Sequence, residues 1–321
     1  MNDKRDLPFI YLLTKIHLLV VPPAILLFTT LLTGWYWWAV AVPYFYISQL
    51  YFKGRFGLMF HCLCHRKTFK APWQQPLHSY ITWIICPLFG HAPEGYFSHL
   101  MGMHHIENNM PDDTSSTMSY QRDSLRGFLA YFFRFIFRGV TDTIHYLFVR
   151  KRKKLCQRLT IGEYVYLLFC IGMCFINLKA TFVVFIVPLL FARLVMMLGN
   201  WAQHSFIDAT EPENLYRNSI NCINTVYNRT CWNDGYHIIH HLRPGMHYTD
   251  MPGEFLKRKD EFALQKAIVF DGIHYLHIFT WLLTKRYDKL ADNLVNINGT
   301  MFQSKEEAIA LMKERTKKIM P

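Results

Sequence analysis

The sequence has little charge, and acidic charge is the scarcer kind. Only 18% of its 321 residues are charged, with 23 acidic side chains against 35 lysines and arginines. A typical soluble domain has about a quarter of its residues charged. Because 51% of the residues are hydrophobic, a disordered chain is excluded. The formal net charge of +12 is compatible with nucleic acid, anionic lipid or an anionic substrate as partner.

The absence of several motifs narrows the class of protein further. The sequence has no solenoid-length repeat, zinc finger or RNA-recognition signature, so a nucleic-acid partner is not expected. Its eight cysteines follow no framework spacing, and we interpret them as reduced thiols. The one strong basic run, residues 150–154, is typical of a cytoplasmic loop beside a membrane segment.

Long apolar runs are what the sequence has instead. From Phe9 to Phe52 only Lys15 carries a full charge, and Gly34 divides the run into two segments. Their lengths of about 24 and 18 residues are close to the roughly 20 that cross a bilayer. A second apolar pair, residues 162–173 and 181–200, is divided by a short turn at residues 177–179. Each pair predicts a hairpin of transmembrane helices.

The charges on either side of these hairpins predict their orientation. The hairpin turns carry at most Lys179, whereas the N-terminus, the basic run and the lysine-rich C-terminus lie on the other side. The positive-inside rule therefore places both termini and the large polar segments in the cytoplasm. Arg193 interrupts the last apolar segment, so it either snorkels or faces the interior.

These patterns predict an all-α integral membrane protein with a single domain. Four transmembrane helices, at about 9–52 and 162–200, are expected under a cytosolic helical cap at about 53–160 and 201–290, followed by a tail at 291–321. Residues 77–89 are too short to span and are expected to be re-entrant or interfacial. Residues 127–149 and 270–283 are expected to be amphipathic helices lying on the membrane.

Histidines are unusually frequent, and nine of the 16 fall into four groups on the predicted cytosolic side. Positions i, i+3 and i+4 of a helix share one face. Crowded imidazoles repel one another when protonated and gain more by sharing a metal. One structural zinc takes four ligands, so nine imidazoles indicate two metals, although imidazole alone does not choose among iron, copper, zinc and nickel. The groups are His61 and His65; His99, His104 and His105; His204; and His237, His240 and His241.

The order of these groups, their place after apolar hairpins and the final HxxHH resemble the membrane fatty acid desaturase and hydroxylase superfamily. The resemblance covers roughly residues 9–250. It implies a centre of two iron ions with O2 as co-substrate, and the nine histidines as iron ligands. Asn200, four residues before His204, resembles an asparagine of acyl-CoA desaturases that reaches iron through water. Alkane monooxygenases are also similar, with HxxxH first and HxxHH last.

The second histidine group departs from the family pattern. It reads HxxxxHH, where HxxHH or HxxxHH is usual, and five residues of regular helix put His99 about 140° from His104. A π-bulge, or a break at Gly102, would restore a shared face. Ligating histidines usually donate their second N–H to a carboxylate or carbonyl. The acids expected to support the ligands in this way are Glu107, Asp112, Asp113 and Asp234.

The resemblance implies an O2-dependent oxidoreductase that acts on a lipid-like acyl chain. A fatty acid desaturase that introduces a C=C bond is the leading hypothesis, and a hydroxylase of fatty acid, alkane, sterol or related lipid is the alternative. The sequence shows no His-Pro-Gly-Gly motif and no redoxin domain, so an external electron donor of cytochrome b5, ferredoxin or rubredoxin type is expected. The expected location is the endoplasmic reticulum of a eukaryote or the inner membrane of a bacterium. A metal transporter is disfavoured because the histidines cluster beside the apolar runs rather than at their centres.

Overall fold

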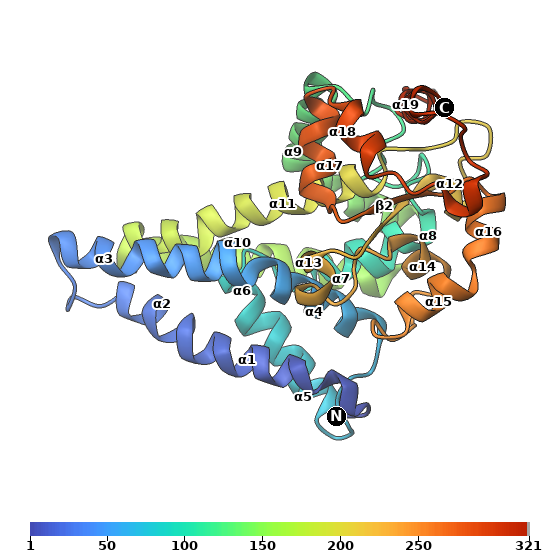
Figure 1. The fold of residues 1–321 in the computed structure, drawn as a ribbon. Helices are drawn as coiled ribbons and strands as arrows, with labels where there is room; N and C mark the ends of the chain where they lie inside the picture. The colour runs from blue at the N-terminus through green and yellow to red at the C-terminus, as the bar shows by residue number, and fades with distance from the viewer. Residues whose placement is uncertain (320–321) are drawn as a thin grey trace. The chain divides into compact units, whose positions relative to one another are not determined.

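The computed structural model describes residues 1–319 and divides the chain into two compact units. The first unit contains residues 1–100 and 147–194, and the second contains residues 101–146 together with the chain from Val195 onward. Figure 1 shows that both units are mainly helical. The prediction of a helical protein is confirmed at this level.

Five consecutive helices begin the first unit. They are α1 (Leu7–Leu19), α2 (Val21–Leu27), α3 (Gly34–Phe45), the π-helix η2 (Tyr46–Phe52) and α4 (Lys53–His65). After them come α5 (Gln74–Tyr80), the π-helix η3 (Ile81–Ile85), α6 (Cys86–Leu88) and α7 (Gly95–His99). The predicted segment 77–89 is therefore helical, and its helix begins three residues earlier than expected.

The first predicted hairpin turns at Gly34. This glycine has a φ of +52°, a left-handed conformation that favours glycine, and α3 begins there. The chain then returns beside α2, because the Trp37 indole donates a hydrogen bond of 3.0 Å to the Leu27 carbonyl. The turn therefore lies where the sequence predicted it.

The second hairpin consists of α10 (Lys153–Thr181), the π-helix η5 (Phe182–Ile186) and the start of α11 (Val187–Gln203). The helix breaks at Asn177, whose φ of −158° and ψ of 99° are extended. The Tyr166 hydroxyl donates to the Phe185 carbonyl at 3.2 Å, which shows that the two arms run back along each other. Arg193 lies 3.4 Å from Glu163 on the opposite arm, so it pairs inside the hairpin.

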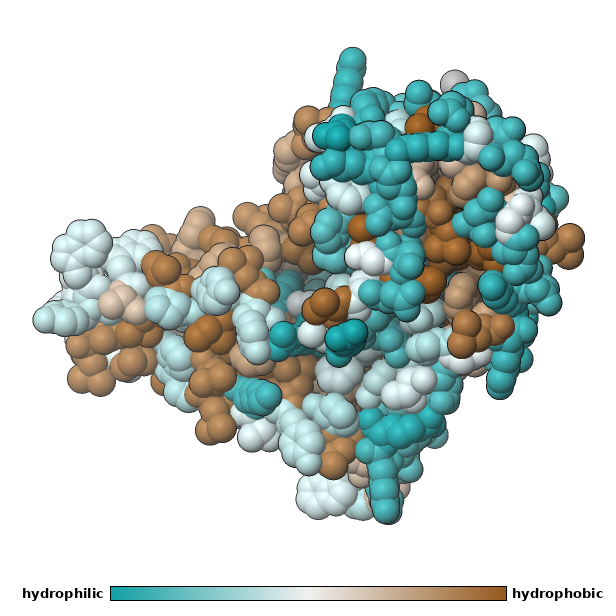
Figure 2. All heavy atoms as spheres, viewed as in Figure 1, coloured by the Kyte–Doolittle hydropathy of each residue, from teal (hydrophilic) through white to brown (hydrophobic). Residues whose placement is uncertain are grey.

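Two helices among residues 1–319 are long and apolar enough to cross a membrane. They are residues 4–27 and residues 153–203, the second of which contains the break at Asn177. Only 28% of the most apolar window of each helix is buried, so most of its side chains are available to lipid. Brown apolar residues mixed with pale aromatic ones cover this part of the first unit in Figure 2.

The second unit has a small sheet at its centre. The parallel strands β1 (Ile220–Ile223) and β2 (Ile268–Asp271) pair with Ile220 opposite Ile268, and most of their side chains are fully buried. The unit's other elements are the π-helix η4 (Leu100–His104), which begins at the boundary, then α8 (His105–Glu107), α9 (Leu125–Val149), α12 (Leu215–Asn218), α13 (Val226–Thr230), α14 (His237–Leu242), α15 (Met251–Lys257), α16 (Lys259–Leu264), α17 (Tyr275–Leu283), α18 (Tyr287–Asp292), η6 (Ile297–Gly299) and α19 (Lys305–Arg315).

Two sequence predictions are corrected in this unit. The fold is not all-α, because β1 and β2 form a sheet. The helix expected over residues 270–283 begins at Tyr275, since Phe270 belongs to β2. The predicted amphipathic helix over 127–149 is present as α9, and the Phe128 and Phe279 rings, 4.6 Å apart, pack it against α17 (Figure 1).

Candidate metal centre

The first histidine pair lies on α4 in the first unit. His61 and His65 are one turn apart, and their Nε2 atoms are 3.1 Å from each other. The spacing HxxxH therefore brings two imidazoles to one face of a helix, as expected.

The second histidine group is reached through a π-helix. Residues Leu100–His104 form η4, between α7, which ends at His99, and α8, which begins at His105. A π-helix adds one residue to a turn, and such bulges are frequent at functional sites. The π-bulge, one of the two irregularities that the HxxxxHH spacing suggested, is present as η4.

Four buried histidines of the second unit point their ring nitrogens at one position. They come from η4, from the residue after α11, and from α14, and one ligand atom of each lies within 4.8 Å of the others. We call this set the four-histidine cluster: His104, His204, His237 and His241.

His204 is held as a neutral ring with a free nitrogen. Its Nδ1–H donates to the Asn218 backbone carbonyl at 3.0 Å, so Nε2 carries the lone pair. Nε2 is buried and makes no hydrogen bond among the described residues. Burial, with the nearby His104 ring as a smaller cause, lowers the pKa of His204 to about 4. A buried lone pair without a donor is costly in a protein interior, and a metal ion would satisfy it.

His237 and His241 lie one helical turn apart on α14 with their Nε2 atoms 3.0 Å from each other. His241 Nδ1–H donates to the Asn108 side-chain oxygen at 2.8 Å, and burial lowers the pKa of His241 well below its usual value. Its Nε2 therefore also carries a lone pair. Two nitrogens that each lie about 2.1 Å from one ion, at a right angle, are separated by about 3 Å. The spacing fits metal ligands.

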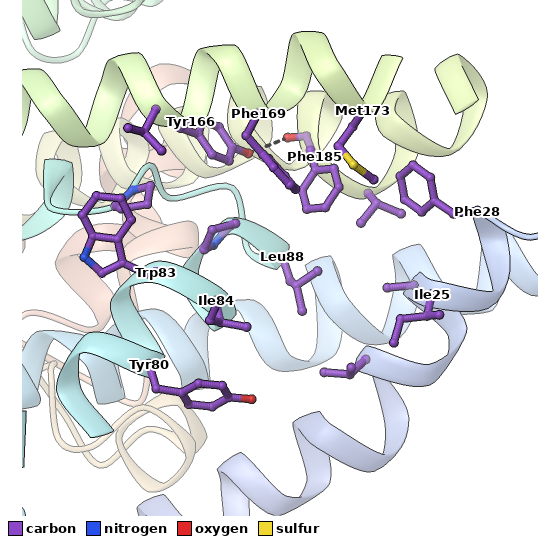
Figure 3. Close-up of a pocket in the computed structure, with 16 residues that line it drawn as sticks. Ile25, Phe28, Tyr80, Trp83, Ile84, Leu88, Tyr166, Phe169, Met173 and Phe185 are labelled. Atoms are coloured by element: carbon purple, nitrogen blue, oxygen red, sulfur yellow. Dashed lines mark hydrogen bonds between the residues drawn. The ribbon is translucent and has the colours of Figure 1, made fainter. Parts of the chain in front are cut away.

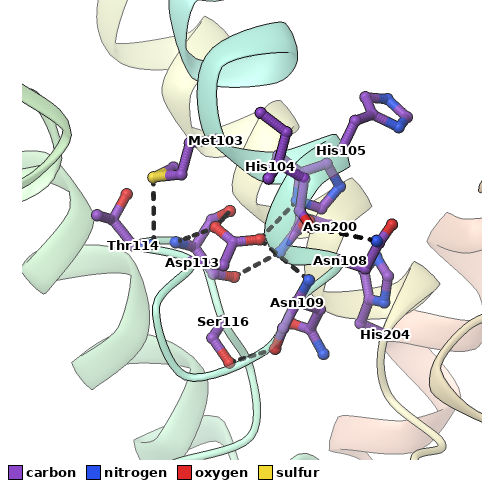
Figure 4. Close-up of polar contacts among 12 residues, drawn as sticks. Met103, His104, His105, Asn108, Asn109, Asp113, Thr114, Ser116, Asn200 and His204 are labelled. Carbon is purple, nitrogen blue, oxygen red and sulfur yellow. Dashed lines mark hydrogen bonds and ion pairs between the residues drawn. The ribbon is translucent and has the colours of Figure 1, made fainter. Parts of the chain in front are cut away.

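His104 is oriented by Asp113, as Figure 4 shows. Its Nδ1–H donates to a carboxylate oxygen of the fully buried Asp113 at 2.7 Å. The other carboxylate oxygen of Asp113 accepts from the Ser115 backbone and hydroxyl at 2.8 and 2.6 Å. This carboxylate–histidine arrangement fixes the orientation of the ring and leaves Nε2 to face the cluster.

His105 and His240 form a second pair in the same unit, with their Nε2 atoms 3.1 Å apart. Asn200 lies one turn before His204, and its amide donates to the Ser115 carbonyl and the Tyr131 hydroxyl, both at 2.8 Å. These bonds leave the side-chain oxygen of Asn200 as the group that could face a metal-bound water.

The other three predicted supporting acids lie in different surroundings. Glu107 accepts a hydrogen bond from the Tyr146 hydroxyl, and Asp112 is exposed. Asp234 is half-buried and accepts from the Tyr227 hydroxyl at 2.7 Å and from the Gln203 amide at 3.4 Å. Neither of these partners is a histidine, and burial raises the pKa of Asp234 to about 6.

Three asparagines in the site were not singled out from the sequence. Asn108 and Asn218 accept from cluster histidines, and Asn109 links them, because its amide donates to the Asn218 side-chain oxygen at 3.0 Å. Asn108 and Asn109 both have left-handed φ values, which asparagine tolerates better than most residues. The Asn-Asn pair soon after the second histidine group was therefore a usable sequence signal for a turn at the site. No comparable signal lies near Asn218 in the sequence.

The fold and the site together define a histidine-rich protein whose clustered imidazoles could hold a metal ion and whose longest helices are suited to a membrane. Imidazoles held neutral, with an Nε2 lone pair facing inward on His204 and His241, suit a divalent transition metal such as iron. Residues 35–270 match the family model for fatty acid desaturase. Because this match covers well over half of the 321 residues, the chain belongs to the fatty acid desaturase family. Neither a curated protein nor a solved structure matches it.

Proposed function

We propose that this protein is an O2-dependent di-iron oxidoreductase that introduces a C=C bond into a lipid acyl chain. The family supports an oxidoreductase that acts on lipid, and the four-histidine cluster supports a metal. The single observation that carries the proposal is the buried, unpartnered Nε2 of His204, which faces three other imidazoles. When bound, the iron pair would supply activation of O2 and removal of hydrogen from an unactivated carbon.

The residues of the chain hold and orient the metal in this proposal. The four-histidine cluster would hold one iron, with Asp113, Asn108 and Asn218 fixing the rings from behind. In the same unit, His105 and His240 would bind the second iron, with Asn200 acting through water. His61, His65 and His99 are also proposed as iron ligands, from the spacing of the histidine groups in the sequence.

The proposed membrane arrangement follows the two hairpins. Both would cross the membrane twice, with the termini and the histidines on the cytosolic side, as the charge distribution predicts. An external donor of cytochrome b5, ferredoxin or rubredoxin type would supply electrons. The substrate would be a fatty acyl lipid, because the first unit, which contains α4 and its histidine pair, exposes mainly apolar side chains on its long helices.

The test is product analysis with purified protein in vesicles, loaded with ferrous iron and given a deuterated acyl lipid, O2 and a chemical reductant. A product that has lost two hydrogens or deuteriums and gained no oxygen is expected. A product that contains one oxygen atom from ¹⁸O2 would make the protein a hydroxylase and overturn the desaturase proposal. His204→Ala should give neither product.

A further inference from the structure

An apolar cavity of about 440 Å³ lies in the first unit, where Tyr166, Phe169 and Phe185 are among the residues that line it (Figure 3). None of the residues that line it is charged, so it is consistent with the proposed acyl substrate and adds no further chemistry. The polar interior of the second unit contains a more specific feature.

This feature is a fully buried arginine, Arg122, in the loop between Asp113 and α9. A buried charge is costly unless its donors are hydrogen-bonded. The guanidinium has five N–H donors, and here they reach only backbone carbonyls. Its six acceptors are the carbonyls of Thr117, Met118, Tyr120, Ser205, Arg315 and Lys317. Arg122 therefore joins three separate segments of the second unit.

Two of these segments hold the backbone of His204, a member of the four-histidine cluster. Ser205, whose carbonyl accepts from Arg122 Nε at 3.1 Å, directly follows His204. The Thr117 hydroxyl donates to the His204 carbonyl at 2.7 Å. The Trp201 indole donates to the Arg122 carbonyl at 3.0 Å, so the end of α11 is fixed to the same loop. The buried arginine therefore acts one residue away from a proposed metal ligand.

The third segment, residues 315–319, pairs its backbone with both of the others. Three hydrogen bonds of 2.9 Å make this contact, from the Ile207 amide to the Arg315 carbonyl, from the Arg122 amide to the Thr316 carbonyl and from the Ile319 amide to the Met118 carbonyl. Arg315 is itself buried, and its guanidinium donates to the Lys266 carbonyl at 2.9 Å and lies 3.3 Å from the Asp208 carboxylate. Two buried arginines therefore fix this segment beside the turn that carries His204.

These contacts bear on the metal centre because a ligand has to be held within about 0.5 Å of its productive position. The Asn218 carbonyl orients the His204 ring, whereas Thr117 and Arg122 hold the backbone on either side of the His204 carbonyl. Loosening of residues 315–319 would thus reach the ligand through Arg122 and Ser205. By linkage, a metal that binds better when the segment is in place also holds the segment in place.

We propose that Arg122 is a positioning residue for His204, and that it couples metal binding at the four-histidine cluster to the docking of residues 315–319. This inference rests on the proposed metal site, but it does not depend on the oxidation of a lipid.

The experiment measures amide hydrogen exchange by mass spectrometry on the full chain in detergent micelles, with and without Co²⁺. Co²⁺ is the probe because imidazole ligands bind such divalent ions and its visible absorption reports the ligand geometry. Binding at the four-histidine cluster is identified as the Co²⁺ binding that His204→Ala removes. In the wild type we expect Co²⁺ to slow the exchange of residues 205–207 and 315–319 by about tenfold.

Arg122→Lys keeps the charge but cannot reproduce the planar fork of five donors. This variant should bind Co²⁺ about 10- to 100-fold more weakly, with an altered visible spectrum. Saturating Co²⁺ should slow the exchange of its residues 315–319 much less than in the wild type. Arg126→Lys is the matched control, because Arg126 is exposed in the first turn of α9, and it should behave as the wild type does.

Two outcomes would overturn the inference. One is a wild-type chain that binds Co²⁺ at the cluster without slower exchange at residues 315–319, a comparison that decides even if Arg122→Lys does not fold. The other is an Arg122→Lys variant with the Co²⁺ affinity and spectrum of the wild type, whose exchange is faster by the same factor with and without Co²⁺. Such an arginine would only stabilise the fold.

The same data separate this inference from the proposed function. A wild-type chain that binds no Co²⁺ would overturn the metal site and the coupling together. A chain that binds Co²⁺ and shows the slower exchange supports the coupling even if it oxidises no acyl lipid.

Discussion

The Asp113 carboxylate accepts hydrogen bonds from the His104 ring, the Ser115 hydroxyl and the Asn109 backbone amide. The first of these donors belongs to a cluster histidine and the other two belong to the loop after it. The carboxylate therefore connects a proposed metal ligand to that loop. Asp113→Asn would offer one neutral oxygen and an amide in place of the carboxylate. We expect a loss of about 10- to 100-fold in iron affinity, measured by competition with a chelator.

Asp112→Asn is the matched control for this change, since its side chain is exposed and the same charge is removed. It should bind iron as the wild type does. Equal iron affinity in the two variants would show that Asp113 does not support a ligand.

Gly235 lies two residues before α14, where the chain passes close to two oxygen atoms. A Cβ at this position would lie 2.3 Å from the Asn228 side-chain oxygen and 2.4 Å from the Cys222 carbonyl. Gly235→Ala should therefore displace the start of α14 and reduce both the iron content and the melting temperature. Gly245→Ala, with no atom within 4 Å of the added carbon, should leave both unchanged. A normal iron content in Gly235→Ala would contradict the placement of His237.

Asp234 predicts how stability depends on pH. Burial raises its pKa to about 6 in the folded state, above the value of 3.8 for a solvated carboxyl. The folded state then binds more protons than the unfolded state. The contribution of Asp234 to the free energy of unfolding is therefore complete below about pH 4 and is lost as the pH rises through 6. The full effect is roughly 3 kcal/mol. Asp234→Asn keeps the oxygen that accepts from Tyr227 and should remove this part of the pH dependence in melting experiments. An unchanged pH profile would show that Asp234 is solvated or already paired.

At the scale of the elements, α9 has three faces. Phe128, Tyr131 and Phe135 are buried against the protein, whereas Phe133 and Phe137 are exposed on a second face and Arg134 and Arg138 on a third. A helix that packs on protein along one side and exposes rings and arginines along the others is typical of a membrane interface.

A photo-crosslinking test distinguishes these faces. Benzoylphenylalanine at position 137, where the native side chain is 77% exposed, should crosslink to lipid in phosphatidylglycerol vesicles. The same group in place of Arg138, which is 69% exposed, should crosslink several-fold less because that face points to water. Equal yields at the two positions would contradict an interfacial helix.

The elements also show where sequence reasoning works. Both hairpin turns, the amphipathic α9 and the irregular second histidine group are encoded locally, by Gly34, by Asn177 and by the five-residue spacing between His99 and His104. The β1–β2 pair was missed because each strand has only four residues and its partner lies more than 40 residues away. A short apolar strand of this kind has no periodicity that separates it from a buried helical segment.

At the scale of the whole molecule, the nine grouped histidines are divided between the two compact units. The four-histidine cluster lies entirely in the second unit. The sequence predicted which histidines to consider. It did not predict that Asn108, Asn109 and Asn218 support them. Their hydrogen bonds to one another join segments more than 100 residues apart, and only the Asn-Asn pair after the second histidine group leaves a local signal.

The central claim is that these histidines hold two iron ions, and metal analysis of the purified chain with Mössbauer spectroscopy tests it most directly. We expect about two irons per chain with nitrogen-rich ligation, and a large loss of iron in His204→Ala, whose Nε2 is the buried unpartnered atom of the cluster. Val42→Phe, at an exposed position in the first unit, should retain the full iron content. A chain that binds only zinc, or that keeps all its iron after His204→Ala, would contradict this account.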